Sequence, residues 1–433
     1  MSQAAAGKTE GERALVYAAI VILVGVLATT LAQTVILAKI PLQNILKNTL
    51  HADRTANAGF FFWSTLPWYF KPLIGMFQDA VPAFGSRRRS YLIIGGATAT
   101  LCWFGLALVP VTYGGLLALS ILISTAMVVA STAIGGYMVE AGRASAEPGR
   151  LTSVRNVAEQ ISVLCGGPGG GFLGTIALVW TGVACGAIAL LIVPVAWFFI
   201  HERAQPTAPG RFLAEARTQL RAIGSARTLW AAAGLAALFY SAPGLVTAVF
   251  YIQQNDLHMN TQAQGFLTFL SGSAGVVAAA LYGAFACRRL TLRTLLIVCL
   301  LAGAVGNFAY WFYGSVTQAS IAETVNGFGY TLAEVAIMHL AVRATPAGSE
   351  ALGFSLIMSV RNFCLYGGDW IGAAMIDRWH LPFHQLVAIN AATTLLAVPL
   401  VLFLPKALTL ARDARQSDAT IDMTPPPPHG LHE

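Results

Sequence analysis

Long apolar stretches recur through the whole of this chain, and they constrain its fold more than any other feature of the sequence. A helix needs about 20 apolar residues to cross a bilayer, and twelve stretches of this kind can be placed along the chain. Backbone groups in lipid must form their hydrogen bonds within the segment, so we predict that these stretches are helices. They are too long and too continuous for the strands of a membrane β-barrel.

The low content of charged residues agrees with this interpretation. Only 10% of the 433 residues are charged, whereas soluble domains contain about 25%. The residues outside the twelve stretches suffice for short loops and tails, but not for a soluble domain. We therefore predict an all-α integral membrane protein, and the composition argues against a soluble enzyme and against a nucleic-acid-binding module.

The predicted spans fall into two sets of six. The first set lies in 1–200 and the second in 228–405, with a basic cytoplasmic linker at 201–227 between them and a disordered tail at 406–433. Within the linker, 211–221 is expected to form an amphipathic surface helix. We place the spans at 14–38, 57–77, 90–109, 114–138, 152–176, 178–200, 228–252, 264–286, 294–313, 318–341, 351–375 and 384–404.

The positions of Lys and Arg predict the orientation in the membrane. Positively charged residues concentrate in cytoplasmic loops. With both termini in the cytoplasm, 20 of the 26 Lys and Arg residues fall in cytoplasmic segments, and the outer loops hold only Lys39, Lys47, Arg54 and Arg378. The net charge of +7 is thus explained by topology rather than by a nucleic-acid partner.

The two sets of spans resemble each other. The loop after the second span carries three arginines at 87–89, and the loop after the eighth carries Arg288, Arg289 and Arg293. The loops after the fourth and tenth spans begin with the same dipeptide, Arg-Ala, at 143–144 and 343–344. Two six-helix repeats around a basic linker predict a major facilitator architecture, with a substrate site at the midplane between the halves.

The sharpest motif runs from the second span into its cytoplasmic loop. It contains Gly75, which permits close helix packing, and Asp79, which can pair with the arginines at 87–89 or cap a helix end. A charge cluster that forms in one conformation and breaks in another acts as a switch; the alternative is that the arginines only set the topology. Lys71 lies inside the span and either reaches back to the cytoplasmic surface or faces a cavity.

The string PWYFKPLIGMFQDAVPAFGSRRRSYLIIGG at 67–96 resembles the signature of the folate-biopterin transporter family, a branch of the major facilitator superfamily. Gln33 stands near a Gln of that family's first span, and Glu140 with Arg143 is similar to the end of its fourth span. The stretch 346–351, followed by Ser359 and Asn362, is similar to its loop into the eleventh span. The resemblance implies a transporter of folates or pterins, with Glu140 and Arg143 belonging to the switch.

The sequence departs from the family pattern in two ways, which concern the substrate and the membrane in which the protein resides. The segment 41–50 lacks the acidic extended form expected after the first span. The outer loops are also very short compared with those of eukaryotic members, so we expect a protein of a bacterial inner membrane. Importers of muropeptides or siderophores share the layout and a similar basic loop, and they remain alternatives.

Charged side chains inside the spans are costly and usually face a cavity or a partner. Four polar residues of the tenth span share one helical face, namely Glu323, Asn326, Tyr330 and Glu334. Glu323 lies near the outer end, where solvation is the alternative to a function. Glu334 is expected to pair with Arg361 of the eleventh span, either as a structural pair or as a site where a substrate anion competes for the arginine.

The fifth span carries a second charged pair and a run of glycines. Arg155 and Glu159 are spaced i,i+4 and can pair with each other. The glycines at 166–171 have the spacing of small residues that let helices pack closely, and we expect them at the interface between the halves.

We therefore predict a secondary transporter of an organic anion, a folate or pterin, driven by protons or by an exchanged solute. Protein partners, metals and cofactors are not expected, and the chain is expected to be a monomer in the bilayer and not an enzyme, since it lacks HExxH and GxSxG motifs. A receptor or assembly factor that does not transport is a further alternative. The residues assigned to the site are Lys71, Arg361 and Asn362 for the anion, Gln33 and Asn326 for neutral hydrogen bonds, Trp68 and Tyr330 for stacking on a flat ring, and Glu159 and Glu334 for proton coupling.

The charge distribution generates a prediction about topology. In a variant without native cysteines, a single cysteine at Ala208 or at Ala414 should be protected from an impermeant thiol reagent added outside intact cells, because both positions are expected in the cytoplasm. Permeabilised cells serve as the positive control. Rapid labelling of both positions in intact cells would contradict the predicted orientation.

Overall fold

The computed structural model describes residues 2–145, 148–200, 202, 209–346 and 350–409, and within these ranges every regular element is a helix. The helices before the linker, which we call the first half, are α1 (Ser2–Leu31), α2 (Lys39–Asn48), α3 (Arg54–Ser64), α4 (Leu66–Tyr69), α5 (Lys71–Ala80), α6 (Arg89–Gly105), α7 (Tyr113–Ser145), α8 (Pro148–Leu173), α9 (Leu178–Leu190) and α10 (Ile192–Phe199). The linker forms α11 (Pro209–Ser225).

The second half contains the remaining elements. They are α12 (Arg227–Tyr240), α13 (Val246–Asn255), α14 (Thr261–Leu281), the π-helical turn η1 (Tyr282–Ala286), α15 (Cys287–Arg289), α16 (Leu292–Phe308), η2 (Ala309–Phe312), α17 (Val316–Ala344), α18 (Glu350–Asp377), α19 (Phe383–Leu400), η3 (Val401–Phe403) and α20 (Lys406–Thr409). The predicted surface helix of the linker is therefore present, and the segment expected to be a disordered tail begins with a helical turn. The rest of that tail, 410–433, lies outside the described residues.

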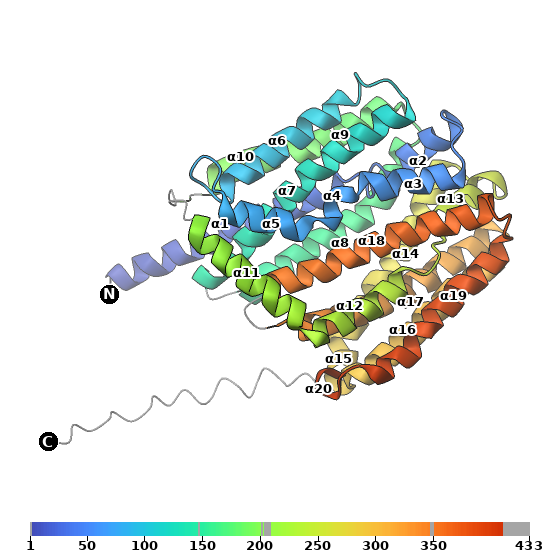
Figure 1. Cartoon of the computed structure of the whole chain (residues 1–433). Coiled ribbons are helices and arrows are strands. Elements are labelled where there is room, and N and C mark those ends of the chain that lie inside the picture. The colour runs from blue at the N-terminus through green and yellow to red at the C-terminus, as the bar shows by residue number, and fades with distance from the viewer. Residues whose placement is uncertain (1, 146–147, 201, 203–208, 347–349, 410–433) are drawn as a thin grey trace.

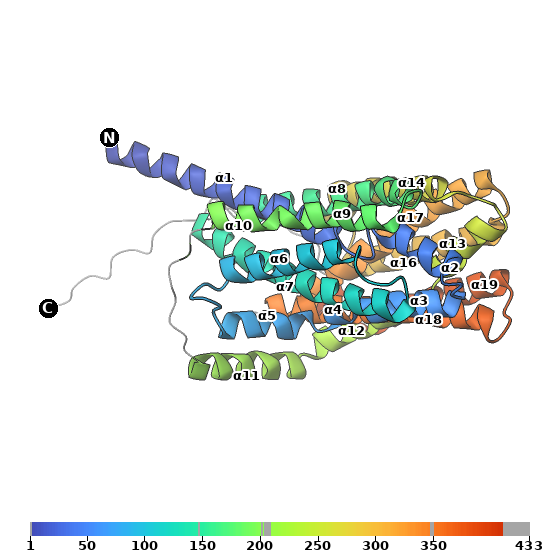
Figure 2. The ribbon, with the colours of Figure 1, turned by 90° about the horizontal axis from the view of Figure 1, so that it is seen from above.

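The helices run side by side along one long direction (Figures 1 and 2). We call the end that carries α11 and the α5–α6 loop the linker end, and the end that carries the α2–α3 and α13–α14 turns the distal end. Within the described residues, six helices are by themselves long and apolar enough to span a membrane, and α11 meets α12 at a bend of 71°. The other passes are built from shorter helices, for example α3 to α5, and together the described helices cross the bundle twelve times.

Prolines explain why several passes are broken. A proline has no backbone N–H, so it is tolerated in the first turn of a helix and disrupts the interior. Pro67 and Pro72 stand in the first turns of α4 and α5 and thereby divide the second pass. Pro243 lies in the turn between α12 and α13.

The first pass differs from the prediction. The apolar stretch was expected to end at residue 38, with Lys39 in an outer loop, but Lys39 is the first residue of α2. Since α2 runs on to Asn48, Lys39 lies about 13 Å from the distal end of that helix at 1.5 Å per residue. The lysine is thus a membrane-embedded residue and not part of an outer loop.

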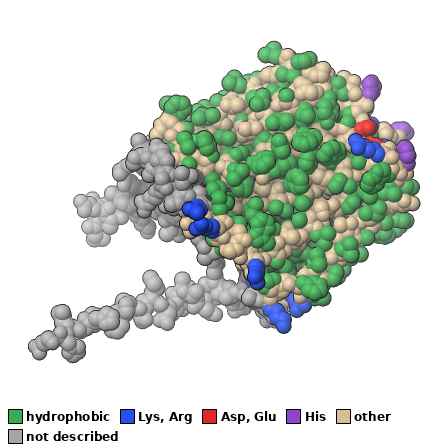
Figure 3. All heavy atoms as spheres, viewed as in Figure 1, with side chains coloured by type: hydrophobic (Ala, Val, Ile, Leu, Met, Phe, Trp, Pro, Cys, Tyr) green, Lys and Arg blue, Asp and Glu red, His purple; other side chains and the backbone are tan. Residues whose placement is uncertain are grey.

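The surface of the bundle is apolar between its two ends. Figure 3 shows hydrophobic side chains over the broad side of the molecule, with Lys and Arg near the linker end and a mixed group of charged side chains and His near the distal end. Large exposed apolar side chains include Leu101, Leu108, Phe172, Trp180 and Phe403. This apolar belt is the surface that a bilayer would cover.

Asp377 joins the two halves at the distal end. Its carboxylate accepts hydrogen bonds from the backbone N–H of Thr55 at 2.7 Å and from the Thr55 hydroxyl at 3.0 Å. It also forms an ion pair of 3.2 Å with Arg54. The last residue of α18 in the second half thereby binds the first turn of α3, where a negative charge is favoured.

Lys47 and Tyr251 add further distal contacts between the halves. The Lys47 ammonium donates to Gln254 at 2.9 Å and to Asn255 at 2.5 Å. The Tyr251 hydroxyl donates to the backbone carbonyl of Ala52 at 2.5 Å. Between described residues, the side-chain hydrogen bonds that join the two halves lie at this end, apart from one of 3.4 Å from the Ser359 hydroxyl to the Trp68 carbonyl.

The glycine run in α8 packs where it was predicted to pack. A Cβ atom on Gly167 would stand 2.8 Å from the carbonyl oxygen of Gly265 in α14, and one on Gly171 would stand 2.6 Å from that of Thr261. Real side chains do not approach backbone so closely, so only glycine allows α8 and α14 to meet here. This contact holds the two halves together in their distal portion.

Candidate functional site

Five charged side chains from both halves lie at a common depth in the bundle. They are Lys71 of α5, Arg155 and Glu159 of α8, Glu334 of α17 and Arg361 of α18. Counted at 1.5 Å per residue from the helix ends at the linker end, they lie about 10 to 16 Å inside the bundle. We call them the central charged layer.

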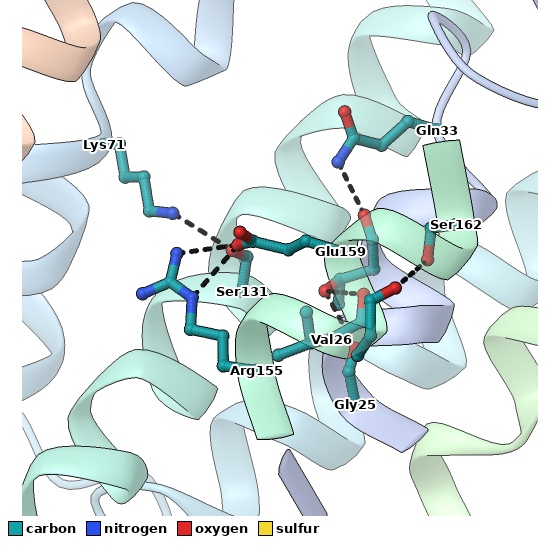
Figure 4. A network of polar contacts seen from close by, with 10 residues as sticks. Gly25, Val26, Gln33, Lys71, Ser131, Arg155, Glu159 and Ser162 are labelled. Carbon is teal, nitrogen blue, oxygen red and sulfur yellow. Dashed lines mark hydrogen bonds and ion pairs between the residues drawn. The ribbon is translucent and has the colours of Figure 1, made fainter. Parts of the chain in front are cut away.

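The first half contributes a lysine beside an ion pair (Figure 4). The Lys71 ammonium donates to the Ser131 hydroxyl at 3.0 Å and lies 5.2 Å from the centre of the Trp68 ring. Arg155 donates two hydrogen bonds, of 3.0 and 2.9 Å, to one oxygen of Glu159. Lys71 and Arg155 converge on the same region from different helices, so the first half presents two cations and one carboxylate.

Gln33 lies in the turn between α1 and α2, at the edge of this group (Figure 4). Its side-chain amide donates to the backbone carbonyl of Thr29 at 2.7 Å. That bond leaves the side-chain oxygen of Gln33 as a free acceptor in the described part of the chain.

The second half contributes the predicted pair of Glu334 and Arg361. The guanidinium donates to one oxygen of Glu334 through Nε at 2.8 Å and through Nη2, and it donates through Nη1 to the Asn362 side chain at 2.9 Å. The two side chains are 25% and 20% exposed, so water-sized probes reach both. Because α17 and α18 extend beyond the predicted spans, Glu334 and Arg361 lie at the same level rather than one turn apart.

Aromatic side chains surround the arginine. The Arg361 guanidinium lies 5.2 Å from the centre of the Tyr240 ring, and Tyr330 lies 5.7 Å from Phe239, ring centre to ring centre. The Tyr240 hydroxyl is buried and has no hydrogen-bond partner in the described structure. Unpaired buried hydroxyls are costly, so this group is poised to bond a ligand. The sequence analysis missed Tyr240 because a tyrosine at the end of an apolar stretch looks like a packing residue.

The predicted polar face of α17 divides into two places. Glu334 and Tyr330 belong to the central layer, whereas Asn326 donates to Asn307 at 2.9 Å. Glu323 accepts hydrogen bonds from the hydroxyls of Tyr310 and Tyr313. Glu323 lies about 10 Å inside α17 from its distal end at 1.5 Å per residue, two turns deep rather than the one turn expected.

The charges of the central layer do not cancel. Arg155 is neutralised by Glu159, and Arg361 by Glu334. Lys71 forms no ion pair within the described residues, since its hydrogen-bond partner is the neutral Ser131. The layer therefore carries one excess positive charge, which favours an anionic ligand between the halves.

The loop after α5 holds the second group of predicted residues. Arg88 is buried and forms ion pairs with Asp79 at 2.7 Å and with Glu140 at 2.8 Å. Burial alone would lower the pKa of the Arg88 guanidinium, but the two carboxylates outweigh it, so the pKa lies above its usual value and the charge is retained. All three residues belong to the first half, so the cluster fastens α5, α6 and α7 to one another.

The other predicted switch residues surround this cluster. The Arg89 guanidinium lies 4.5 Å from the centre of the Trp197 ring, and the Nε of Arg87 is buried without a partner in the described structure. A Cβ on Gly75 would stand 3.2 Å from Thr132, so α5 approaches α7 closely there. The side chain of Arg143 lies outside the described residues.

Glu202 was missed by the sequence analysis. Its carboxylate accepts a hydrogen bond from the Ser86 hydroxyl and bonds the backbone N–H groups of Arg88 at 3.1 Å and Arg89 at 3.5 Å. It thereby caps the start of α6. A glutamate in a basic linker gives no sequence signal for such a role.

No group of three or more His, Cys, Asp or Glu side chains in the described parts of the chain is arranged to hold a metal ion. The central layer offers hydrogen-bond donors and a positive charge instead. It is suited to binding and releasing an anion without chemical change.

Comparisons with known proteins agree with this geometry. A sequence model described as the BT1 family matches residues 33–422. The chain is 26% identical over 427 residues to a folate-biopterin transporter from Synechocystis sp., which covers 89% of this chain and 82% of that protein.

Solved structures of low sequence identity share the fold. A D-xylose–proton symporter superposes with a TM-score of 0.67 at 16% identity, covering 90% of this chain and 97% of that chain. A bacterial homologue of the human lysosomal transporter Spinster superposes with a TM-score of 0.60 at 13% identity, covering 91% and 94%. The predicted fold class is thereby confirmed as the twelve-helix major facilitator fold.

The Glu334–Arg361 contact generates a prediction about stability. Glu334→Gln should destabilise the protein by on the order of 2 kcal/mol, because it strands a buried arginine, and Glu334→Gln with Arg361→Gln should recover part of the loss. The measurement is the melting temperature of the purified protein in detergent.

Glu159→Gln is the matched control. Its pair with Arg155 lies along one helix and its side chains are 38% and 35% exposed, so the loss should be only roughly 0.3–0.5 kcal/mol. Strictly additive losses for Glu334→Gln and Arg361→Gln would show that the two charges do not depend on each other.

Proposed function

This chain belongs to the BT1 family, and on that premise we propose that it carries an organic anion of the folate or pterin class across the membrane. The family membership and the major facilitator fold make it a secondary transporter and not an enzyme. The named substrate of the Synechocystis relative supports the folate or pterin class for this chain.

The observation that carries the proposal is the excess positive charge of the central layer. Lys71 has no anionic contact within the described residues, and a carboxylate of the substrate would supply it. The free side-chain oxygen of Gln33 and the unpaired hydroxyl of Tyr240 would bond the polar edge of a pterin ring, with Asn362 beside them. The rings of Trp68 and Tyr330 would stack on its faces.

Asn326 contributes less directly than the sequence suggested. Its amide is engaged by Asn307, and it lies about two turns of α17 away from Glu334. We propose that Asn326 supports the residues around the site, and that the substrate contacts the central layer directly.

Alternating access would proceed by separation of the two halves at the distal end. The polar contacts that join the halves at this end are few, with Asp377 and Lys47 at their centre, and they accompany the glycine packing of α8 on α14. The excess of Lys and Arg in the linker-end segments supports a cytoplasmic linker end. The bacterial relative supports a bacterial inner-membrane location. This structure would then be the inward-facing state of a monomeric transporter.

The Arg88 cluster would keep the first half rigid while it moves. In the state described here, Asp79 and Glu140 both bind Arg88 within the first half. Closure of the linker end would bring the cluster, with Arg87, Arg89 and Arg143 beside it, against the second half, and Asp79 could then exchange partners.

Protons would be coupled through the two paired carboxylates. A substrate anion that binds Arg361 competes with Glu334, and one that binds Arg155 competes with Glu159. A carboxylate that loses its arginine in a poorly solvated site favours the protonated form. Substrate and proton would therefore enter together.

Uptake by the purified protein in proteoliposomes tests this proposal. Tritiated folic acid should accumulate, and Lys71→Gln should reduce uptake at least about tenfold, since hydrogen bonds to charged groups contribute about 1.5–3 kcal/mol. The matched control is Lys406→Gln, an exposed lysine at the linker end that should transport normally.

Other outcomes of the same assay would overturn the proposal in different ways. Uptake of a muropeptide or a siderophore without uptake of folate or biopterin would replace the substrate class. Binding of folate without uptake would indicate a receptor, and equal uptake by Lys71→Gln and wild type would remove the lysine from the site.

A further inference from the structure

A second membrane-embedded group of charges lies toward the distal end, outside the central layer. Lys39 of α2 in the first half lies within electrostatic range of Asp369 and Glu323, both of the second half. It forms no ion pair or side-chain hydrogen bond within the described residues, so it contacts neither carboxylate directly. A lysine of one half and two carboxylates of the other thus lie at a similar depth, about 10 to 13 Å from the distal ends of α2, α17 and α18 at 1.5 Å per residue.

The two carboxylates have different surroundings. Asp369 accepts hydrogen bonds from the backbone N–H of Thr247 at 3.0 Å and from the Thr247 hydroxyl at 2.6 Å. It is committed to capping the first turn of α13, a structural role that requires the charge. Within the described residues, Glu323 has no such backbone partner and is bonded by two neutral hydroxyls.

The two tyrosines around Glu323 can satisfy either protonation state. Tyr310 donates to one oxygen at 3.0 Å and Tyr313 to the other at 3.1 Å. A hydroxyl can donate to a carboxylate or accept from a carboxylic acid by rotating. When Glu323 is protonated, the Tyr310 hydroxyl can accept from it and donate instead to Asn326, which it contacts at 3.5 Å. The Tyr313 hydroxyl, which accepts from Gln253 at 2.7 Å, continues to donate to the other carboxyl oxygen.

Among the described residues, Lys39 is the one cation whose charge acts on Glu323, which is bonded by Tyr310 and Tyr313. The cations of α16 and α12, Arg293 and Arg227, stand at the linker-end starts of these helices. The helix α14, which packs along α17, contains no charged residue. Lys39 is therefore the one cation whose position decides whether a charged Glu323 is compensated.

We propose that Glu323 is a proton-binding site of the transport cycle and that Lys39 controls its occupancy across the interface between the halves. The idea deepens the proposed transport function, on which it rests for its coupling to movement. When the distal contacts are closed, Lys39 stands close and stabilises the carboxylate. When the halves separate distally, α2 withdraws with Lys39, and Glu323 takes a proton from water on the distal side.

Reclosure reverses the step. Lys39 returns, the charged carboxylate is again favoured, and the proton leaves toward the linker end because the distal path is shut. Each cycle thus carries one proton from the distal side of the membrane to the linker-end side, with no net gain or loss of protons. Glu323 thereby couples a proton gradient to the movement even when Glu334 and Glu159 remain paired.

Infrared difference spectra of the purified protein test the site without any substrate. Between about pH 8 and pH 6, above the range in which exposed carboxyls titrate, wild type should gain a protonated-carboxyl band. Glu323→Gln should lack it. Asp256→Asn, which removes an exposed carboxylate at the same end, is the matched control and should keep it.

Two variants that retain the carboxylate test its surroundings. Lys39→Gln should make the band appear at higher pH, by about one pH unit or more, because the compensating cation is gone. Tyr313→Phe should shift it in the same direction by removing one donor. A band that persists in Glu323→Gln would overturn the site, and an unshifted band in Lys39→Gln would overturn the control by Lys39.

Proteoliposomes loaded with tritiated folic acid test the coupling. Glu323→Gln should still exchange labelled for unlabelled folate, but an imposed pH gradient should no longer raise its accumulation above the level without a gradient. Gradient-driven accumulation by Glu323→Gln at the wild-type level would overturn the coupling. If wild type does not move folate at all, the proposed substrate fails, while the infrared result still decides the proton site.

Discussion

A charge buried in the hydrocarbon region must be compensated, and this constraint organises the interior of the protein. Arg361 is compensated by Glu334 and Arg155 by Glu159, while Asp369 is satisfied by Thr247 at the start of α13. Two lysines, Lys71 and Lys39, have no anion in contact within the described residues. At these two positions, a ligand or a movement of the halves would change the electrostatic free energy most, because it would bring an anion to the lysine or take one away.

The compensated charges inside the bundle are paired within one half. Arg155 with Glu159 and Arg88 with its two carboxylates belong to the first half, and Glu334 with Arg361 belongs to the second. Movement of the halves therefore breaks no ion pair in the interior, and of the ion pairs between described residues only Arg54–Asp377 at the distal end joins the halves. The ion pair and most of the polar contacts that join the halves are gathered at the distal end, so opening there breaks a small set of bonds around Asp377, Lys47 and Tyr251.

The sequence was sufficient to predict the fold, since apolar length and the distribution of Lys and Arg follow directly from the bilayer. It was also sufficient for the Glu334–Arg361 contact, because two opposite charges at similar depth have few other partners. It was insufficient for depth along a helix. The helical angles place Glu323 and Glu334 on one face, but they lie about 16 Å apart along α17 at 1.5 Å per residue. Glu334 therefore belongs to the central charged layer, and Glu323 lies in a separate group toward the distal end.

Lys39 and Tyr240 show a second limit. A lysine at the end of an apolar stretch marks the end of a span in most chains, and only the break before α2 places Lys39 inside the membrane. Tyr240 is counted among apolar residues, and the role proposed for it depends on the position of Arg361 on another helix. Both depend on contacts between segments far apart in the sequence, which a local pattern does not encode.

We propose that the two halves move as units and that the distal contacts held by Asp377 control this movement. Pulsed electron paramagnetic resonance tests this most directly, with spin labels at Asn48 and Asp256 across the distal end and at Phe84 and Leu290 across the linker end. In Asp377→Asn the distal distances should lengthen while the linker-end distances shorten, relative to the wild type. Unchanged distances at both ends, or lengthening at both, would contradict the account.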